Sequence, residues 1–212
     1  MNVNTGKKQS FVEMESEDNY VATPRQLVQA TAEILALSEA TVIVHDRNLA
    51  TAPTPLRSVA GRGKAAARVT AGDAANLLIA VAASESVKDS AKTVFAYRDL
   101  LGESAVNSGI QRYDELPDNH TLGQALAALI EAAAAKEITL SRKLNLKVTF
   151  FGPRAKAKIE WEINGASSWT GYEPPSKWPA KTKLIPVGDL ERMTTITENT
   201  IFRLGAAVGD SR

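Results

Sequence analysis

Residues 23–81 constrain the fold most, because they alternate helix-start signals with one basic, glycine-containing segment. Thr23 can cap a helix that has Pro24 at its first position and Gln26 at its third. This combination is a capping box with proline at the first helical position. Apolar residues then recur at the spacing of one helix face, at Leu27, Ala30, Ile34 and Leu37. The pattern predicts a first helix over roughly residues 24–37.

Two further helix starts follow. Ser38 can cap a second helix through Val42 and Leu49, which prolines at positions 53 and 55 bring to an end. Thr70, with Asp73 three residues later, predicts another start. The helical pattern behind Thr70 continues to position 101, where Gly102 is the expected stop.

The segment between these helices, residues 56–68, is basic and contains no acid. Its cations are Arg57, Arg62, Lys64 and Arg68. Taken alone, such a segment is most often a solvated surface loop. Its place between helices is the order of a winged helix-turn-helix, in which a positive wing contacts phosphates beside a recognition helix. That position favours phosphate contact over the solvated loop.

Two nucleotide-binding motifs are excluded at this segment. A phosphate loop needs glycine five residues before the Gly-Lys glycine and Ser or Thr after the lysine, whereas the chain has Ser58 and Ala65 there. A relaxed dinucleotide fingerprint fits residues 61–66, but no strand pattern precedes it.

The C-terminal half changes from helical to strand periodicity. Thr121 and Gln124 form a capping box before an apolar, alanine-rich helix. Residues 144–150 and 155–163 then alternate apolar and polar around a Gly152-Pro153 turn, which predicts a β-hairpin with one buried face. Residues 166–186 carry four prolines and three large aromatic residues and are expected to form an ordered loop. A last helix is expected from about Thr197 to position 208.

Composition excludes several classes of chemistry. The 212 residues include no cysteine, so disulfides, cysteine nucleophiles and cysteine-type zinc sites are excluded. The net charge is +1, so only the distribution of charge can favour nucleic acid. No apolar run approaches the roughly 18 residues of a membrane span, and a cytoplasmic location is expected.

The two histidines, His45 and His120, do not form a metal pair. A lone histidine on a helix is more often a packing or surface residue than a catalyst, and His120 is expected to be solvated. No nucleophile–base pair is visible, so the chain is not expected to be an enzyme, and no cofactor is expected. A second basic region over residues 142–158 is either a nucleic-acid contact or a set of edge-strand lysines that oppose aggregation.

Residues 41–81 resemble the winged-helix family of MerR-type regulators and excisionase-like proteins. The resemblance rests on three stretches, residues 45–49, 61–68 and 70–73. In that family a Tyr-Asp-Arg-like segment precedes a leucine, a basic wing follows, and a Thr-x-x-Asp helix start comes next. His45 here replaces the tyrosine, and the region after position 81 lacks the family's dimerising coiled coil. The whole chain also resembles uncharacterised proteins of proteobacterial prophages and mobile elements.

These patterns predict an α+β protein in which an N-terminal winged helix-turn-helix precedes a helical segment and a C-terminal β-hairpin packed on helices. The expected divisions are a disordered acidic tail (1–20), a DNA-binding domain (21–101), a connection (102–119) and an oligomerisation or partner-binding domain (120–212). The expected function is that of a DNA-binding transcriptional regulator of a phage or mobile element. The alternatives are a DNA-packaging adaptor resembling a small terminase subunit, and a structural or protein-interaction module that does not bind DNA.

The expected partner is double-stranded DNA. The chain is also expected to form a homo-oligomer or to bind a protein partner through its C-terminal half. No interaction with a membrane is expected. Eight residues are expected to contact the DNA, the first four from the second helix and the others from the wing: Thr41, His45, Arg47, Asn48, Arg57, Arg62, Lys64 and Arg68.

Overall fold

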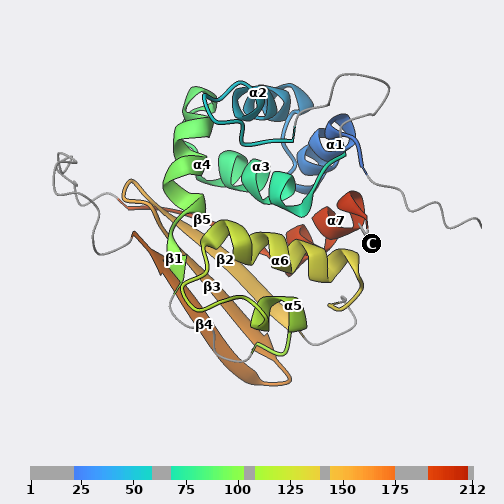
Figure 1. Ribbon diagram of the computed structural model, residues 1–212, viewed down its shortest axis with the longest axis vertical. Coiled ribbons are helices and arrows are strands. Elements are labelled where there is room, and N and C mark those ends of the chain that lie inside the picture. The colour runs from blue at the N-terminus through green and yellow to red at the C-terminus, as the bar shows by residue number, and fades with distance from the viewer. Residues whose placement is uncertain (1–21, 59–67, 103–107, 139–143, 175–190, 210–212) are drawn as a thin grey trace, which may run out of the picture.

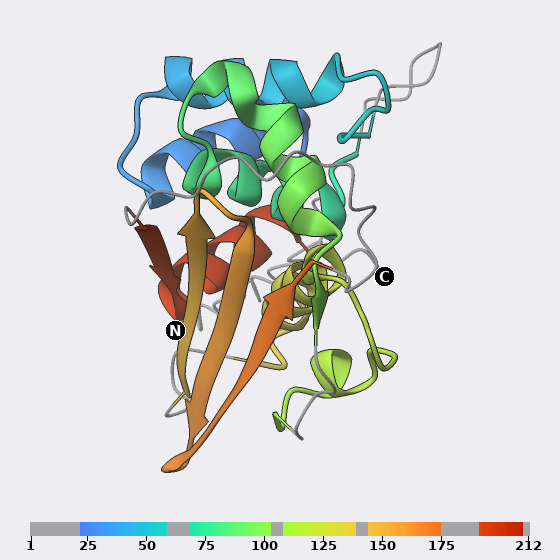
Figure 2. The same cartoon turned by 90° about the vertical axis from the view of Figure 1, so that its left-hand side faces the viewer.

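The computed structural model describes residues 22–58, 68–102, 108–138, 144–174 and 191–209. They form seven α-helices, one short 3-10 helix and a five-stranded antiparallel sheet with the order β1-β4-β3-β2-β5. Helices α6 and α7 lie across one face of the sheet, and α1 to α4 gather at one end of its strands (Figures 1 and 2). The α+β class expected from the sequence is therefore confirmed.

The elements have the following bounds in chain order. The helices are α1 (Pro24–Ile34), α2 (Glu39–Ala50), α3 (Ala71–Ala83), η1 (Val87–Asp89), α4 (Ser90–Arg98), α5 (Gln111–Asp114), α6 (Leu122–Ala134) and α7 (Glu198–Val208). The strands are β1 (Leu101–Gly102), β2 (Leu144–Gly152), β3 (Lys156–Ile163), β4 (Ala166–Glu173) and β5 (Arg192–Thr197).

The helix starts follow the capping signals in the sequence. Complete capping boxes at Thr23, Thr70 and Thr121 open α1, α3 and α6, and the Ser38 side chain accepts from the backbone N–H of Thr41 at the start of α2. Each cap satisfies backbone N–H groups that have no partner within the helix. These four predicted starts are confirmed.

The helix expected to run on to position 101 is instead interrupted. Helix α3 ends at Ala83, and Ser84 has extended backbone angles. η1 and α4 follow, and residues 101–102 form the short strand β1. The expectation of one continuous helix was wrong, because its apolar spacing spans two helices that pack against each other.

The predicted β2–β3 hairpin is confirmed, with one buried face as expected. Leu146 pairs with Trp161 and Val148 with Ile159, and all four side chains are buried. Their neighbours point to the opposite face, where Lys147 lies across from Glu160. The period-2 alternation therefore predicted which side of the hairpin would enter the core.

Residues 166–173 were expected to be a loop and are a strand. Asn164 and Gly165 both have positive φ angles, 53° and 84°, and they form the two-residue link from β3 to β4. This is the geometry that Asn-Gly favours in hairpins. Trp169 and Tyr172 therefore point to opposite faces of β4: Trp169 is exposed and Tyr172 is buried. Residues 175–190 lie outside the described part of the chain.

The N-terminal and C-terminal halves share one apolar core. Helix α3 packs against α6, and α1 packs against α7. Helix α7 approaches α6 closely at Gly205, where an added Cβ would lie 2.6 Å from that of Ala133. The division at residues 102–119 stays a prediction, and it separates segments that contact each other extensively.

The wing of the expected winged helix-turn-helix is not confirmed. Residues 51–58 and 68–70 contain no strand, and the segment between them is not described. Arg62 and Lys64 lie in that segment, and the expected acidic tail (1–20) also lies outside the described residues.

Candidate nucleic-acid interface

Helix α2, the expected recognition helix, packs on its neighbours through one narrow face. Val42, His45 and Leu49 are its buried residues, at spacings of three and four. At its start, the Ser38 hydroxyl accepts from the Thr41 backbone N–H at 3.1 Å and lies 2.7 Å from the Thr41 hydroxyl. Thr41 is half-buried and thus serves the cap as well as the surface.

Two of the residues expected to contact DNA, His45 and Asn48, form hydrogen bonds to η1 and to the first residue of α4. Nδ1 of His45 lies 2.8 Å from the Ser90 hydroxyl, and Asn48 donates to the Val87 carbonyl at 2.6 Å. The Ser90 hydroxyl donates its proton to the same Val87 carbonyl. Because that proton is already engaged, Nδ1 of His45 must carry the proton in its bond to Ser90.

This hydrogen-bond cluster positions α2. His45 is only 5% exposed, and burial lowers its pKa below the usual value, so the ring is neutral near pH 7. Both side chains hold α2 against η1 and α4. Direct base contact by His45 or Asn48 stays a prediction that would require these bonds to break.

The opposite face of α2 is exposed and largely apolar. Its exposed positions follow the helical spacing along one side: Glu39, Ala40, Ile43, Val44 and Arg47. Ile43 and Val44 are 39% and 37% exposed, and Leu37 in the preceding turn is 42% exposed. Of the four residues expected to contact DNA from α2, Arg47 is the one that is fully on this face.

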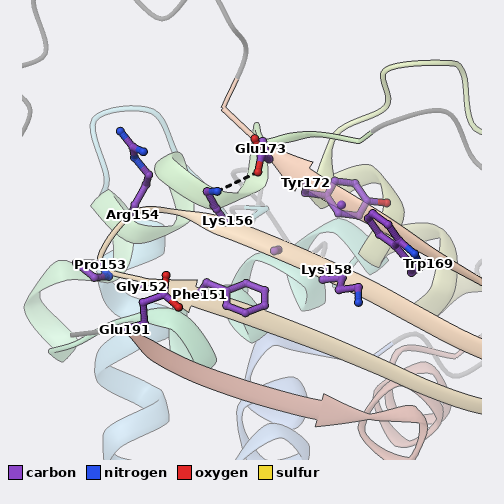
Figure 3. A pocket seen from close by; sticks show the side chains of 12 residues that line it. Phe151, Gly152, Pro153, Arg154, Lys156, Lys158, Trp169, Tyr172, Glu173 and Glu191 are labelled. Carbon is purple, nitrogen blue, oxygen red and sulfur yellow. Dashed lines mark ion pairs between the residues drawn. The ribbon is translucent and has the colours of Figure 1, made fainter. Parts of the chain in front are cut away.

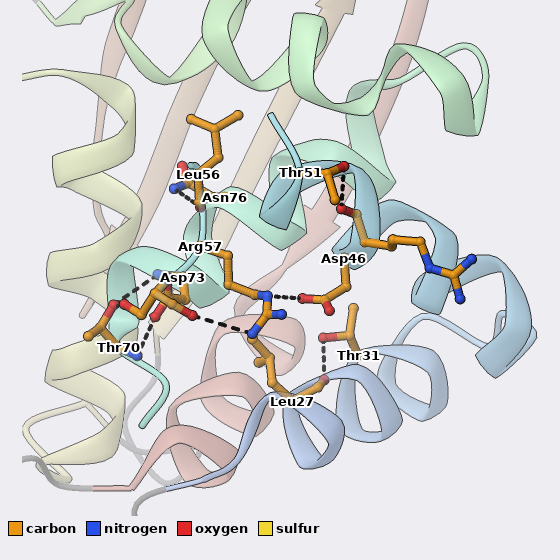
Figure 4. Close-up of polar contacts among 11 residues, drawn as sticks. Leu27, Thr31, Asp46, Thr51, Leu56, Arg57, Thr70, Asp73 and Asn76 are labelled. Atoms are coloured by element: carbon orange, nitrogen blue, oxygen red, sulfur yellow. Dashed lines mark hydrogen bonds and ion pairs between the residues drawn. The ribbon is translucent and has the colours of Figure 1, made fainter. Parts of the chain in front are cut away.

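Arg57 lies beside the inner part of α2. It forms an ion pair with Asp46 at 2.9 Å, and both side chains are mostly buried (Figure 4). Burial raises the pKa of Asp46, the Arg57 guanidinium opposes this, and Asp73 adds to the increase. The ion pair thus ties the start of the basic segment to the middle of α2.

Asp73 joins the two ends of the basic segment. One carboxylate oxygen accepts from the Ser58 backbone N–H at 2.7 Å. The other accepts from both the N–H and the hydroxyl of Thr70 at 2.9 Å (Figure 4). Residues 58 and 70 are therefore held at one carboxylate, next to the Asp46–Arg57 pair. Arg68, which precedes this anchor, is exposed.

The bridging role of Asp73 is not evident from the sequence, although its capping position is. The roles of Asp46 and Ser90 are not evident either, because their partners are distant in the chain. One signal could have suggested this role: a Thr-x-x-Asp helix start directly follows the basic segment, which places Asp73 close to one end of it.

His120 is buried, so the expectation that it is solvated was wrong. Its Nε2 lies 2.8 Å from the Tyr172 hydroxyl, which in turn lies 2.7 Å from the Tyr113 hydroxyl. Burial lowers the pKa of His120, and the Pro117 carbonyl and Asp118 partly oppose the change. Burial likewise raises the pKa of Tyr172. His120, Tyr172 and Tyr113 thus form a hydrogen-bonded cluster in the core.

Three cations of the second basic region, Arg154, Lys156 and Lys158, line a hollow of about 430 Å³ (Figure 3). The hollow lies on the face of the sheet that no described helix covers. Lys156 pairs with Glu173 at 3.0 Å, and Lys158 pairs with Glu160 at 2.8 Å. Lys158 also lies over the Trp169 ring, 5.0 Å from its centre. Both lysines are in β3, an interior strand, so the edge-strand explanation was wrong for them. Their charges are balanced by neighbouring acids, which disfavours this face as a phosphate site.

The chain matches no family model, no curated protein sequence and no solved structure. In the described part of the chain, no group of three or more His, Asp or Glu side chains is placed to hold a metal ion. Across the same residues, no helix has both the length and the apolar character needed to cross a bilayer.

Proposed function

We propose that the chain binds duplex DNA as a sequence-specific transcriptional regulator, through the outer face of α2 and the basic segment of residues 57–68. One observation carries the proposal: Asp73 holds both ends of an acid-free segment with three cations, Arg62, Lys64 and Arg68, and the Arg57–Asp46 ion pair ties that segment to α2. An exposed helix face next to a basic segment with anchored ends fits the major groove and the phosphates that flank it.

Within this proposal the candidate residues have different roles. Arg47 faces the groove from the exposed side of α2, and half-buried Thr41 contacts the DNA from the first turn of that helix. Arg68, together with Arg62 and Lys64, neutralises phosphates and sets the position of the helix. His45 and Asn48 hold α2 at its angle to α4 through Ser90 and Val87. We assign Arg57 to the same positioning role, because its guanidinium is engaged by Asp46.

The C-terminal half completes the proposal as the site of self-association or of a protein partner. Its uncovered sheet face carries Trp169 and Met193, which are 56% and 67% exposed. If two copies of the chain associate with two-fold symmetry, their two α2 helices could enter successive half-sites on DNA, as in dimeric helix-turn-helix proteins.

The test is a titration of a random duplex library at two salt concentrations. Each phosphate neutralised by the protein contributes about −0.9 to the slope of log affinity against log salt. Arg62→Ala with Lys64→Ala should weaken binding to all sequences and reduce the slope by about 2.

Lys156→Ala with Lys158→Ala is the matched control, since it removes the same charge from the sheet face. It should leave the slope unchanged. Absence of binding at low salt would contradict the proposal, as would equal weakening by the two double variants.

A further inference from the structure

The exposed side of α2 presents alkyl groups where a DNA-contacting helix would be expected to present polar ones. Ile43 and Val44 are exposed one turn before Arg47, while the polar His45 and Asn48 are turned inward to Ser90 and Val87. Residues three and four positions apart share a helix face, so Ile43, Val44 and Arg47 form one surface.

This surface is well defined in shape. Isoleucine and valine are β-branched, and in a helix each strongly prefers one side-chain rotamer. Their methyl groups therefore project from α2 in nearly constant directions. The hydrogen bonds of His45 and Asn48 hold the helix itself on the other side.

The charges around the surface favour duplex DNA as its occupant. Arg47 lies on it and is exposed, and Glu39 is the one exposed acid of α2. Asp73 binds Ser58 and Thr70, and the segment between these residues carries Arg62, Lys64 and Arg68 and no acid. The Arg57–Asp46 pair joins this segment to α2. A polyanion complements this arrangement. In the major groove, thymine is the base that presents a methyl group, and it is recognised by apolar contact.

We infer that Ile43 and Val44 recognise the C5-methyl groups of thymines in the major groove, with Arg47 contacting a neighbouring base or phosphate. The inference rests on the proposed function and names the base chemistry that the site selects. It predicts that preferred duplexes carry thymine where α2 enters the groove.

Replacing thymine by uracil tests this directly, because the change removes only the methyl group. Duplexes enriched by the full-length protein from a random library would be prepared once with thymidine and once with deoxyuridine. The wild-type protein should bind the uracil duplexes more weakly, by roughly 4-fold for each recognised methyl group that is removed. Ile43→Ala with Val44→Ala should bind both kinds of duplex almost equally.

Gln111→Ala is the matched control. It shortens an exposed, uncharged side chain on α5, away from α2, and should keep the full thymine preference. Far-UV circular dichroism of all variants should be unchanged, since the substituted side chains are exposed.

The outcomes separate the inference from the proposed function. Enrichment of duplexes with equal affinity for thymine and uracil would overturn the inference and leave DNA binding intact. A thymine preference that persists in the Ile43/Val44 variant would also overturn it, since DNA shape or another element would then be responsible. Failure to enrich or bind any duplex would end both. A wild-type dimer that the double variant converts to monomer would show that this face pairs copies of the chain instead.

Discussion

The β2–β3 hairpin and α2 both carry mixed polar and apolar sequences, yet polarity predicts side-chain direction in only one of them. In the hairpin, Leu146 and Trp161 are buried while Lys147 and Glu162 are exposed, as the alternation indicates. In α2, by contrast, His45 is buried, whereas Ile43 is exposed.

The difference comes from where each element finds its partners. A strand's side chains alternate strictly between two faces, and one face of this sheet is covered by helices. The inner side of α2 instead meets the polar start of α4, where Ser90 and the Val87 carbonyl need hydrogen-bond partners. Polar residues on α2 are therefore buried because of groups about 40 residues away in the chain.

The largest expected effect concerns the buried face of the hairpin. Trp161 is 4% exposed and contacts the Tyr113 ring at 5.3 Å between centres. Trp161→Ala should lower the free energy of unfolding by about 3–5 kcal/mol through the cavity that it leaves. Trp169→Ala, at the exposed side of the neighbouring strand, should change it by no more than about 0.5 kcal/mol. Urea unfolding measures both, and similar losses would contradict the two-faced description of the sheet.

An intermediate effect is expected on α2. His45→Ala should cost about 1–3 kcal/mol, because Ser90 loses its buried donor. Arg47→Ala should leave stability within about 0.5 kcal/mol of wild type, since its side chain is exposed. The same unfolding assay applies. If Arg47→Ala were the more destabilising of the two, the assignment of inner and outer faces would be reversed.

The smallest effect is a pH dependence from the two buried histidines. Burial lowers the pKa of His45 and His120 in the folded state, so the unfolded chain binds protons more readily as pH falls. Their contribution to stability is fully present above the unfolded pKa of about 6.5 and is lost as pH falls toward the folded values. The melting temperature should therefore decrease as the pH falls from about 7 to about 5. His45→Gln with His120→Gln should flatten this decrease, and an unchanged slope would contradict it.

Local signals in the sequence determined much of this protein. The threonine caps at Thr23, Thr70 and Thr121 open helices because a side-chain oxygen satisfies backbone N–H groups within three residues. The buried face of the hairpin follows from strict alternation. Asn164-Gly165 is a turn signal of the kind that joins two strands, here β3 and β4. These features depend on neighbours in the chain, so they are visible before folding.

Tertiary structure alone decided which residues form the candidate interface. Asp73 joins the ends of the basic segment, Asp46 holds Arg57, and Val87 and Ser90 turn Asn48 and His45 inward. Each of these bonds joins groups brought together only when α2, α3 and α4 pack. The sequence identified α2 and the basic segment that follows it. Which face of α2 points outward was set by the free-energy cost of burying polar groups without partners. That cost is determined by contacts distant in the chain, and it leaves Ile43, Val44 and Arg47 on the surface.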